Sequence, residues 1–321
     1  MNQERSWIEK IKADWGAHGT GTLVGIGDDA AVLSAAGNPV VVTTDMMVEG
    51  VHFDLRYLTP ENVGHRLLTA NLSDLAAMGA TPSWFLVSLA VRKGLSWDFV
   101  ERLYTGMRSV AEPLGVDLVG GNITVSPRQL VLDVTAMGLA PKQVLRNGAR
   151  AGQKLGMTGF PGRASAARTA LDRNCGNAKS NHPEVVKHFL SPVARVSQGV
   201  SLNQAGLVSA MMDVSDGVAS SIHELCRASG CGANLVGCGN DVPLSKLCNE
   251  LSLSFEQLWW FGGEEYELLF AFDPENEQAI RNLIQPLPLQ ILGIVTESDS
   301  VSYSVQGNIQ PLPDSGWDPF L

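Results

Sequence analysis

A run of β-branched residues that leads straight into oxygen-bearing side chains constrains this chain more than any other feature. The run spans 40–53 and reads VVVTTDMMVEGVHF. Its three valines favour a buried strand, which we expect to end where Thr43, Thr44 and Asp45 begin. Hydroxyl and carboxylate oxygens at such a point are ligands that suit Mg²⁺ or Mn²⁺ rather than zinc. Taken alone, the run fits a polar turn and a metal site equally well.

The composition sets the broad class of protein. The 321 residues suffice for two domains of ordinary size, and 45% of them are apolar, which allows sizeable cores. The net charge of −10 argues against a nucleic-acid partner and against docking on an anionic membrane. It leaves a phosphate substrate open, because divalent metals can invert the local charge. No apolar run is long enough for a membrane span and residues 1–15 lack an apolar signal region, so we expect a soluble, cytoplasmic protein.

The five cysteines allow two interpretations. Four of them, Cys226, Cys231, Cys238 and Cys248, fall within 23 positions, a spacing that invites a zinc site. No C-x-x-C pair occurs, however, and the gaps match no common zinc module. We therefore expect reduced, mostly buried thiols.

The first part of the chain, 1–140, predicts an α/β domain. A helix is expected over about 59–78, with Thr59 as its cap and Pro60 at its first position. Short links between some strands indicate a mixed sheet rather than a purely parallel one. The other expected elements are a helix at 96–113 and strands at 23–33 (interrupted by an acidic turn), 40–42, 84–91, 116–119 and 130–139.

The remainder, 141–321, predicts a second α/β domain that begins with a Gly-, Pro- and Arg-containing linker. Its first strand, at 154–158, runs into the loop Gly159–Gly162 and then into a helix. A glycine loop between a strand and a helix can cradle phosphate, but it is equally a generic tight turn. No G-x-x-x-x-G-K-[ST] sequence occurs, which excludes a P-loop enzyme.

Two further stretches of the second domain carry acids. A strand at 208–214 leads into Asp213-Val214-Ser215-Asp216-Gly217. A later run, 264–267, alternates so that Glu264 and Tyr266 should share one face of a strand and Glu265 and Glu267 the other.

Several acids occupy element ends far apart in the sequence. Asp74 lies on an otherwise apolar helix, where it either faces solvent or faces a metal site, and the apolar surroundings favour the site. Acids without a matching basic cluster make sense if divalent cations neutralise them and hold a polyphosphate, as phosphoryl transfer requires. The acids in question are Asp28, Asp45, Asp74, Asp213 and Asp216.

Five motifs together resemble the thiamine-monophosphate kinase family of the aminoimidazole-ribonucleotide-synthetase-like superfamily. They are GIGDDAAVL, TTDMMVEGVHF, NLSDLAAMGA, DVSDG and GGEEYELLF, in this order over almost the whole chain. The resemblance implies an N-terminal α/β domain (1–140) that binds metal and ATP and dimerises through its sheet. It also implies a C-terminal α/β domain (141–321) that completes the phosphate and substrate site. The implied activity uses ATP and several Mg²⁺ ions to convert thiamine monophosphate to thiamine diphosphate, in a homodimer.

The resemblance also implies roles for individual residues. The implied Mg²⁺ ligands are Asp28, Thr43, Thr44, Asp45, Asp74, Asn122, Asp213 and Asp216. The implied ATP contacts are Tyr104, Gly121, Asn122, Arg146 and Ser215. The implied contacts to the thiamine phosphate are His52, Glu264 and Trp317. Physical chemistry agrees for Arg146, a fork donor suited to phosphate, and for Trp317, which could stack on a cationic ring.

The chain departs from the family pattern at several positions, including Gln153, where Asp is usual, and Arg163, in a loop that normally lacks it. Asn122 stands where the family usually has a metal-binding Asp, so one Mg²⁺ site should weaken. Glu265 stands where Asp is usual, a milder change. Asn122 therefore supports an alternative, a weakened or non-catalytic paralogue that binds nucleotide or thiamine phosphate. Another ATP-using member of the superfamily with a different acceptor is a second alternative.

The expected mechanism is direct in-line attack of a substrate phosphate oxygen on the γ-phosphate of ATP. An ionised phosphate needs no strong general base, and no covalent enzyme intermediate is required. The sequence shows no obvious nucleophile–base pair, so we expect no catalytic nucleophile among the side chains.

Overall fold

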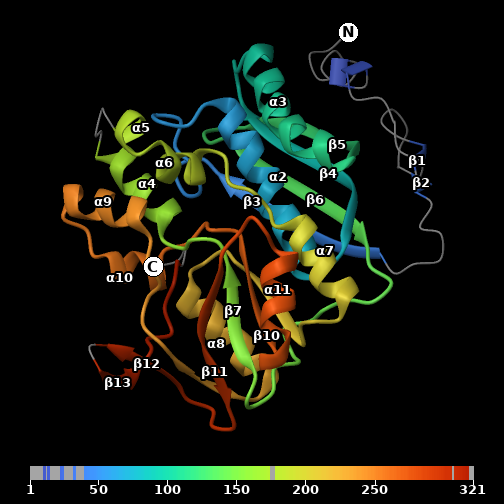
Figure 1. The fold of residues 1–321 in the computed structure, drawn as a ribbon. Coiled ribbons are helices and arrows are strands. Elements are labelled where there is room, and N and C mark those ends of the chain that lie inside the picture. The colour runs from blue at the N-terminus through green and yellow to red at the C-terminus, as the bar shows by residue number, and fades with distance from the viewer. Residues whose placement is uncertain are drawn as a thin grey trace. The chain divides into compact units, whose positions relative to one another are not determined.

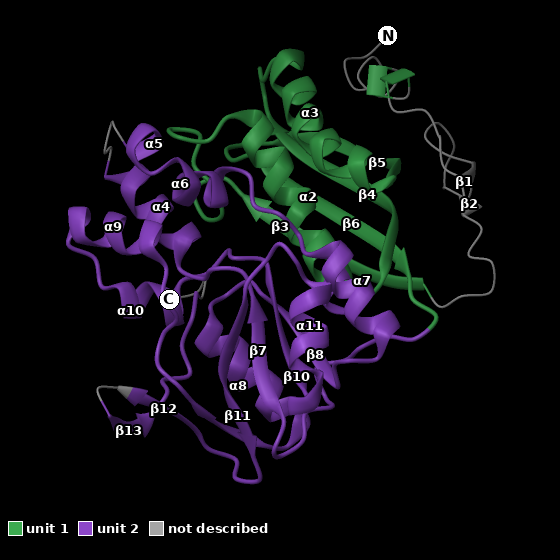
Figure 2. Ribbon diagram, viewed as in Figure 1, with its two compact units in different colours: residues 1–75, 80–141 green, residues 76–79, 142–321 purple. Residues whose placement is uncertain are grey.

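The computed structural model describes residues 10–11, 13–14, 22–24, 32–33, 40–173, 178–305 and 307–317. The chain divides into two compact units (Figure 2). Unit 1 comprises residues 1–75 and 80–141, and unit 2 comprises residues 76–79 and 142–321.

Unit 1 is built on a four-stranded mixed sheet (Figure 1). The strand order is β3-β6-β4-β5, in which β6 pairs antiparallel with β3 and β4, while β4 and β5 are parallel. This combination confirms the predicted mixed sheet. The strands are β3 (Val40–Val48), β4 (Thr81–Arg92), β5 (Asp117–Ser126) and β6 (Val131–Leu139), and a separate antiparallel pair joins β1 (Thr22–Val24) and β2 (Val32–Leu33).

Two long helices, α2 (Pro60–Ala77) and α3 (Trp97–Leu114), pack closely on each other. A Cβ atom on Gly64 would lie 1.9 Å from the carbonyl oxygen of Leu103, and one on Gly106 would lie 2.0 Å from that of Glu61. Glycine is therefore required at both crossing points. Helix α3 begins at a Ser96 cap, whose hydroxyl accepts the N–H of Phe99.

Strand β3 is longer than the sequence predicted. It does not end at Val42 but continues through Thr43, Thr44 and Asp45 to Val48, all paired with β6. The prediction used the end of the apolar run as the strand end, whereas the alternation of the following residues keeps the strand going. Strand β5 likewise continues through Gly121 and Asn122, which were expected to follow a strand.

Unit 2 contains a seven-stranded sheet in the order β13-β12-β9-β11-β7-β10-β8. Its strands are β7 (Lys154–Thr158), β8 (Ala210–Val214), β9 (Gly232–Leu235), β10 (Glu267–Phe272), β11 (Leu289–Thr296), β12 (Val301–Val305) and β13 (Asn308–Pro311). Its helices are α4 (Arg163–Asp172), α5 (Ala178–Asn181), α6 (Pro183–Leu190), α7 (Val196–Ala205), α8 (Val218–Ser229), α9 (Val242–Leu251), α10 (Phe255–Phe261) and α11 (Glu277–Leu283), with a 3₁₀ turn at Pro274–Asn276.

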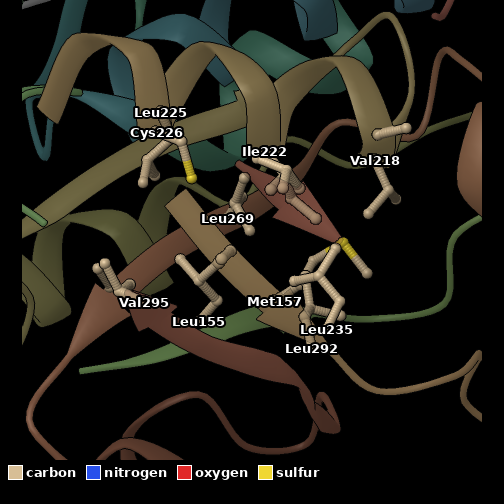
Figure 3. Close-up of a cluster of buried hydrophobic side chains, with 14 of the residues drawn as sticks. Leu155, Met157, Val218, Ile222, Leu225, Cys226, Leu235, Leu269, Leu292 and Val295 are labelled. Atoms are coloured by element: carbon tan, nitrogen blue, oxygen red, sulfur yellow. The ribbon is translucent and has the colours of Figure 1, made fainter. Parts of the chain in front are cut away.

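Helix α8 covers one face of this sheet and positions the loop that precedes it. Val218, Ile222 and Leu225, at helical spacing, pack onto apolar side chains of β7, β9, β10 and β11 (Figure 3). Burial of such side chains stabilises the fold by about 1.5–3 kcal/mol each. The core therefore holds the first turn of α8, and with it the end of β8, in one place.

The stretch 264–267 is not the alternating strand that the sequence predicted. Strand β10 begins at Glu267, and residues 262–266 form an irregular segment. Within it Glu264 and Tyr266 have positive φ angles, 68° and 52°, which are strained for residues with a Cβ. Alternation alone could not reveal this, because extended and left-handed residues give the same sequence pattern.

The described cysteines Cys226, Cys231, Cys238 and Cys248 are free thiols, as expected. Burial raises the pKa of each of these thiols, and that of Cys226 reaches about 12. Cys175 lies outside the described residues. None of the helices in the described ranges is both long and apolar enough to cross a membrane.

Candidate active site

In unit 1, a hydroxyl and a carboxylate meet between β3 and α2. Thr43 Oγ1 donates a hydrogen bond of 2.5 Å to Asp74 Oδ2. Asp45 lies on the same face of β3 as Thr43, because residues two apart in a strand point the same way. The structure thus brings Thr43, Asp45 and Asp74 to one side of the sheet, and Asp74 faces this group rather than only solvent.

Thr44 faces the other side of the same sheet. Its hydroxyl contacts Asp133 Oδ2 and the Val134 carbonyl oxygen, each at 3.1 Å, and Thr135 Oγ1 at 3.2 Å. Thr43, Thr44 and Asp45 were expected to form one ligand group, but the strand's period of two separates the Thr44 side chain from the other two.

Asn122 shares this second face. It lies opposite Ser88 of β4, which in turn lies opposite Asp133 of β6. Its neighbour Gly121 is needed by the sheet itself, because a Cβ there would lie 1.9 Å from the Val87 carbonyl oxygen. The structure therefore does not bring the Asn122 side chain to the face that carries Asp45 and Asp74.

His52 lies in the turn that follows β3. Its Nδ1 accepts the N–H of Val48 at 3.1 Å. Because Nδ1 acts as an acceptor, the neutral ring carries its proton on Nε2, a donor of the kind that binds phosphate oxygen.

Tyr104 lies on α3 and is 6% exposed. Burial raises the pKa of its phenol, which stays protonated at neutral pH and can act as a donor.

In unit 2, the loop from β8 to α8 carries the acids. Asp213 is the penultimate residue of β8 and is 4% exposed, while Ser215 and Asp216 follow directly before the first turn of α8. Carboxylate oxygens of this kind are ligands that suit Mg²⁺.

Two remote segments are tied to this loop by main-chain hydrogen bonds. The Glu264 N–H donates to the Ser215 carbonyl oxygen at 2.5 Å, and the Trp317 N–H donates to that of Asp216 at 2.9 Å. Glycines permit both approaches. A Cβ on Gly263 would lie 2.7 Å from the Ser215 oxygen, and one on Gly316 would lie 2.2 Å from the Asp216 oxygen. The structure therefore gathers the predicted acids and the predicted substrate contacts of this unit.

Arg146 takes a different partner within unit 2. Its Nη1 lies 2.9 Å from Glu224 Oε2 on α8, and both side chains are about half exposed. A partly exposed pair of this kind holds loosely.

The glycine loop after β7 is filled by a side chain of the protein. Glu265 accepts the N–H groups of Gly162 and Ala164 at 2.9 and 3.2 Å, at the start of α4. The helix N-terminus that could have cradled a phosphate therefore holds the Glu265 carboxylate, and the tight-turn interpretation is the one the structure supports. No local sequence pattern around Glu265 indicates this contact.

The donor chemistry of the two acid groups fits Mg²⁺. Asp45 and Asp74 in unit 1, and Asp213 and Asp216 in unit 2, offer carboxylate oxygens, the ligands that Mg²⁺ uses. Within either group the described residues hold no cluster of three Asp, Glu, His or Cys side chains that would bind an ion. Asp28, the remaining predicted ligand, lies outside the described residues.

Family models match both parts of the chain. Residues 27–140 match the N-terminal domain of AIR synthase related proteins, and residues 150–306 match the C-terminal domain. Together with the two α/β units, these matches show that the chain belongs to the AIR synthase related family.

Individual relatives indicate which class of enzyme within this family the chain resembles. The chain is 33% identical to the thiamine-monophosphate kinase of Bacillus subtilis (strain 168), over 87% of each chain. It resembles the crystal structure of the thiamine-monophosphate kinase from Stenotrophomonas maltophilia K279a, with a TM-score of 0.83, 29% identity, and coverage of 93% of this chain and 95% of that one. It also resembles a structure of AaThiL complexed with AMPPCP and TMP, with a TM-score of 0.80, 28% identity, and coverage of 98% and 96%. The chain is accordingly an enzyme of the thiamine-phosphate kinase class, as the resemblance of its motifs implied.

Proposed function

We propose that this enzyme uses ATP and Mg²⁺ to phosphorylate thiamine monophosphate, giving thiamine diphosphate and ADP. The observation that carries the proposal is the joining of three segments in unit 2, where Ser215 and Asp216 are hydrogen-bonded to the Glu264 and Trp317 backbones. Metal-binding carboxylates beside substrate-binding side chains are what transfer between two phosphates requires. The solved complex of a relative with AMPPCP and TMP supports the same pair of ligands.

The proposed metal ligands fall into separate groups. Asp45 and Asp74, with the Thr43 hydroxyl, form one group, to which the resemblance adds Asp28, and Asp213 and Asp216 form another. Bound Mg²⁺ would supply charge neutralisation of the phosphates at these carboxylates. Thr44 and Asn122, if they hold a metal, do so on the opposite face of the unit 1 sheet.

The remaining roles follow the chemistry of each side chain. Trp317 offers an aromatic face to the cationic thiazolium ring, and Glu264 offers a carboxylate. His52 offers its Nε2–H to the substrate phosphate. Tyr104, Gly121, Asn122, Arg146 and Ser215 are the proposed nucleotide contacts.

We infer a direct in-line transfer. An oxygen of the thiamine monophosphate phosphate forms a bond to the γ-phosphorus, and the bond from that phosphorus to the β–γ bridging oxygen breaks to release ADP. The attacking oxygen is already ionised, so no side chain has to remove a proton. The described acids bind and orient the reactants.

We propose that the enzyme is a cytoplasmic homodimer formed through the sheet of unit 1. Val40, Val42 and Met46 of β3 are 41%, 58% and 55% exposed, although they are apolar. Exposed apolar residues grouped on one strand are typical of a protein–protein interface. A second copy of this chain is the proposed partner.

Asn122 supports the competing function, a binding protein with weak or no kinase activity. Loss of a carboxylate at that position removes one charge from a site that the family resemblance assigns to Mg²⁺.

The test is ADP release, measured by a coupled assay with ATP and Mg²⁺ and with either thiamine monophosphate or thiamine as acceptor. We expect ADP release that requires the monophosphate and is lost in Asp216→Asn. Tight binding of both ligands without ADP release would establish the binding protein instead. Faster ADP release with another phosphorylated acceptor would establish a different kinase of the family. An ATP γ-phosphate made chiral with oxygen isotopes should invert its configuration, and retention would exclude the single in-line step.

A further inference from the structure

Two fully buried carboxylates alternate with the two strained residues of the 264–267 segment. Glu265 and Glu267 are 0% exposed, while Glu264 and Tyr266 hold positive φ angles. Strained backbone persists where its surroundings determine the conformation, and it occurs often at ligand-binding sites. The contacts of Glu265 and Glu267 therefore bear on the backbone conformation of Glu264.

Glu265 is held from two sides. The N–H groups of Gly162 and Ala164 donate to it, and His188 Nε2 lies 3.2 Å from its Oε2. His188 comes from α6 and its side chain is 13% exposed. Burial disfavours a charged imidazole, but the Glu265 and Glu267 carboxylates outweigh that effect and raise the pKa of His188. The imidazole is thus suited to a charged contact.

Glu267 is held more tightly still. Arg195 donates to its two oxygens from Nε and Nη2 at 2.7 and 2.5 Å, and Thr158 Oγ1 donates at 2.5 Å. Gly159 leaves room for this carboxylate, because a Cβ there would lie 1.9 Å from Glu267 Oε1. Burial would raise the pKa of Glu267, but Arg195 holds it below the ordinary value. The carboxylate therefore stays ionised and paired with the guanidinium.

His188 lies in the last turn of α6 and Arg195 directly precedes α7, so the two residues belong to one short stretch of chain. That stretch contacts the 264–267 segment through both carboxylates, on either side of Tyr266. The main-chain bonds from Glu264 to Ser215 and from Tyr266 to Val214 fix the opposite side of the segment. The segment is therefore held between the loop from β8 to α8 and the stretch that contains His188 and Arg195.

We propose that His188 and Arg195 are positioning residues that hold the 264–266 segment in the strained conformation in which Glu264 binds the phosphate acceptor. This role rests on the proposed function of Glu264. Neither residue needs to touch the substrate, since each acts through a buried glutamate. Release of either carboxylate lets Glu264 relax toward ordinary φ values, which changes the direction of its side chain relative to the loop that carries Ser215 and Asp216.

The test compares Arg195→Lys with Arg281→Lys. Arg281 also donates through Nε and Nη2 to a glutamate of unit 2, in this case to the single oxygen Oε1 of Glu277, and the Arg281 and Glu277 side chains on α11 are 39% and 25% exposed. Lysine keeps the charge and loses the two-point contact. We expect Arg195→Lys to raise KM for thiamine monophosphate about tenfold while KM for ATP stays within about twofold, and Arg281→Lys to change neither. His188→Gln, which keeps a polar side chain but loses the charge, should lie between wild type and His188→Ala.

Amide hydrogen exchange gives a second measurement that does not depend on the substrate. Exchange at Glu264 and Tyr266 should accelerate in Arg195→Lys, while exchange at Leu155 and Met157 of β7 stays at the wild-type rate. Unchanged exchange at Glu264 together with an unchanged KM would overturn the positioning role. A different outcome is that the wild-type enzyme does not turn over thiamine monophosphate while amide exchange still accelerates in Arg195→Lys. That result would refute the proposed acceptor, but it would still support the role of Arg195 in holding the segment.

Discussion

A single methyl group at Gly316 tests whether Trp317 is held in place to bind substrate. A Cβ at this position would lie 2.2 Å from the Asp216 carbonyl oxygen and 3.0 Å from Ser220 Cβ. The φ of Gly316 is not in the left-handed region, so Gly316→Ala introduces crowding and no backbone strain. Gly237→Ala is a matched control, since its Cβ would have Ser304 O at 3.7 Å as its nearest neighbour.

The size of the effect follows from these distances. Real Cβ contacts essentially never fall below 3.0 Å, so the Gly316 backbone must retreat by about 0.8 Å, the difference between 3.0 and 2.2 Å. The same retreat stretches the 2.9 Å bond from the Trp317 N–H to the Asp216 oxygen beyond hydrogen-bonding range. A lost hydrogen bond costs about 0.5–1.5 kcal/mol, which corresponds to about a 2- to 13-fold loss of affinity.

The assay is steady-state kinetics with each substrate varied in turn. Gly316→Ala should raise KM for thiamine monophosphate about 2- to 13-fold and leave KM for ATP nearly unchanged, while Gly237→Ala should match wild type. Equal kinetics of the two alanine variants would refute the reasoning that Trp317 is positioned by Asp216. A melting temperature measured for both variants separates this effect from general destabilisation.

Three further predictions concern the sheet faces and the buried ion pair. Thr43→Val should raise the Mg²⁺ concentration needed for half-maximal activity about 2- to 13-fold by removing its bond to Asp74, whereas Thr44→Val, on the other face, should not shift it to the same extent. Equal shifts in a Mg²⁺ titration would mean that the two hydroxyls serve one site. Asn122→Asp should lower that Mg²⁺ concentration because a carboxylate is the better ligand, and an unchanged titration would show that position 122 contacts no metal. The raised pKa of His188 means that protonation of its imidazole contributes stability that is fully present below pH 6.5, the ordinary value, and that is lost as pH rises through the higher folded-state value. His188→Gln should flatten that decline in a series of thermal melts above pH 6.5, and a decline that persists in the variant would assign it to another group.

The order of elements in unit 1 could be predicted from the sequence, because apolar periodicity and helix caps are local signals. The Thr59–Pro60 start predicted α2 to within a residue. The extent of β3 and β5 could not be predicted in the same way, since a strand continues as long as a neighbour pairs with it. The error mattered for the site, because a strand that continues through Thr44 sends its side chain away from Asp45.

The acidic residues of the candidate site could be predicted from the sequence, but the residues that hold the neighbouring segment in place could not. Asp213 and Asp216 stood out as carboxylates at a strand end, whereas the roles of Glu265 and Glu267 depend on His188 and Arg195, more than seventy residues earlier in the chain. Buried pairing between such distant residues leaves no local pattern. The left-handed backbone at Glu264 is likewise a consequence of these contacts rather than of the residue type.

Phosphorus NMR of the complete reaction tests the central claim most directly. The purified protein is incubated with ATP, thiamine monophosphate and Mg²⁺, and the phosphorus signals are followed with time. We expect the monoester signal of thiamine monophosphate to be replaced by the paired signals of a diphosphate, with ADP formed in equal amount. An unchanged monoester signal, with ATP either intact or hydrolysed to ADP and free phosphate, would contradict the account.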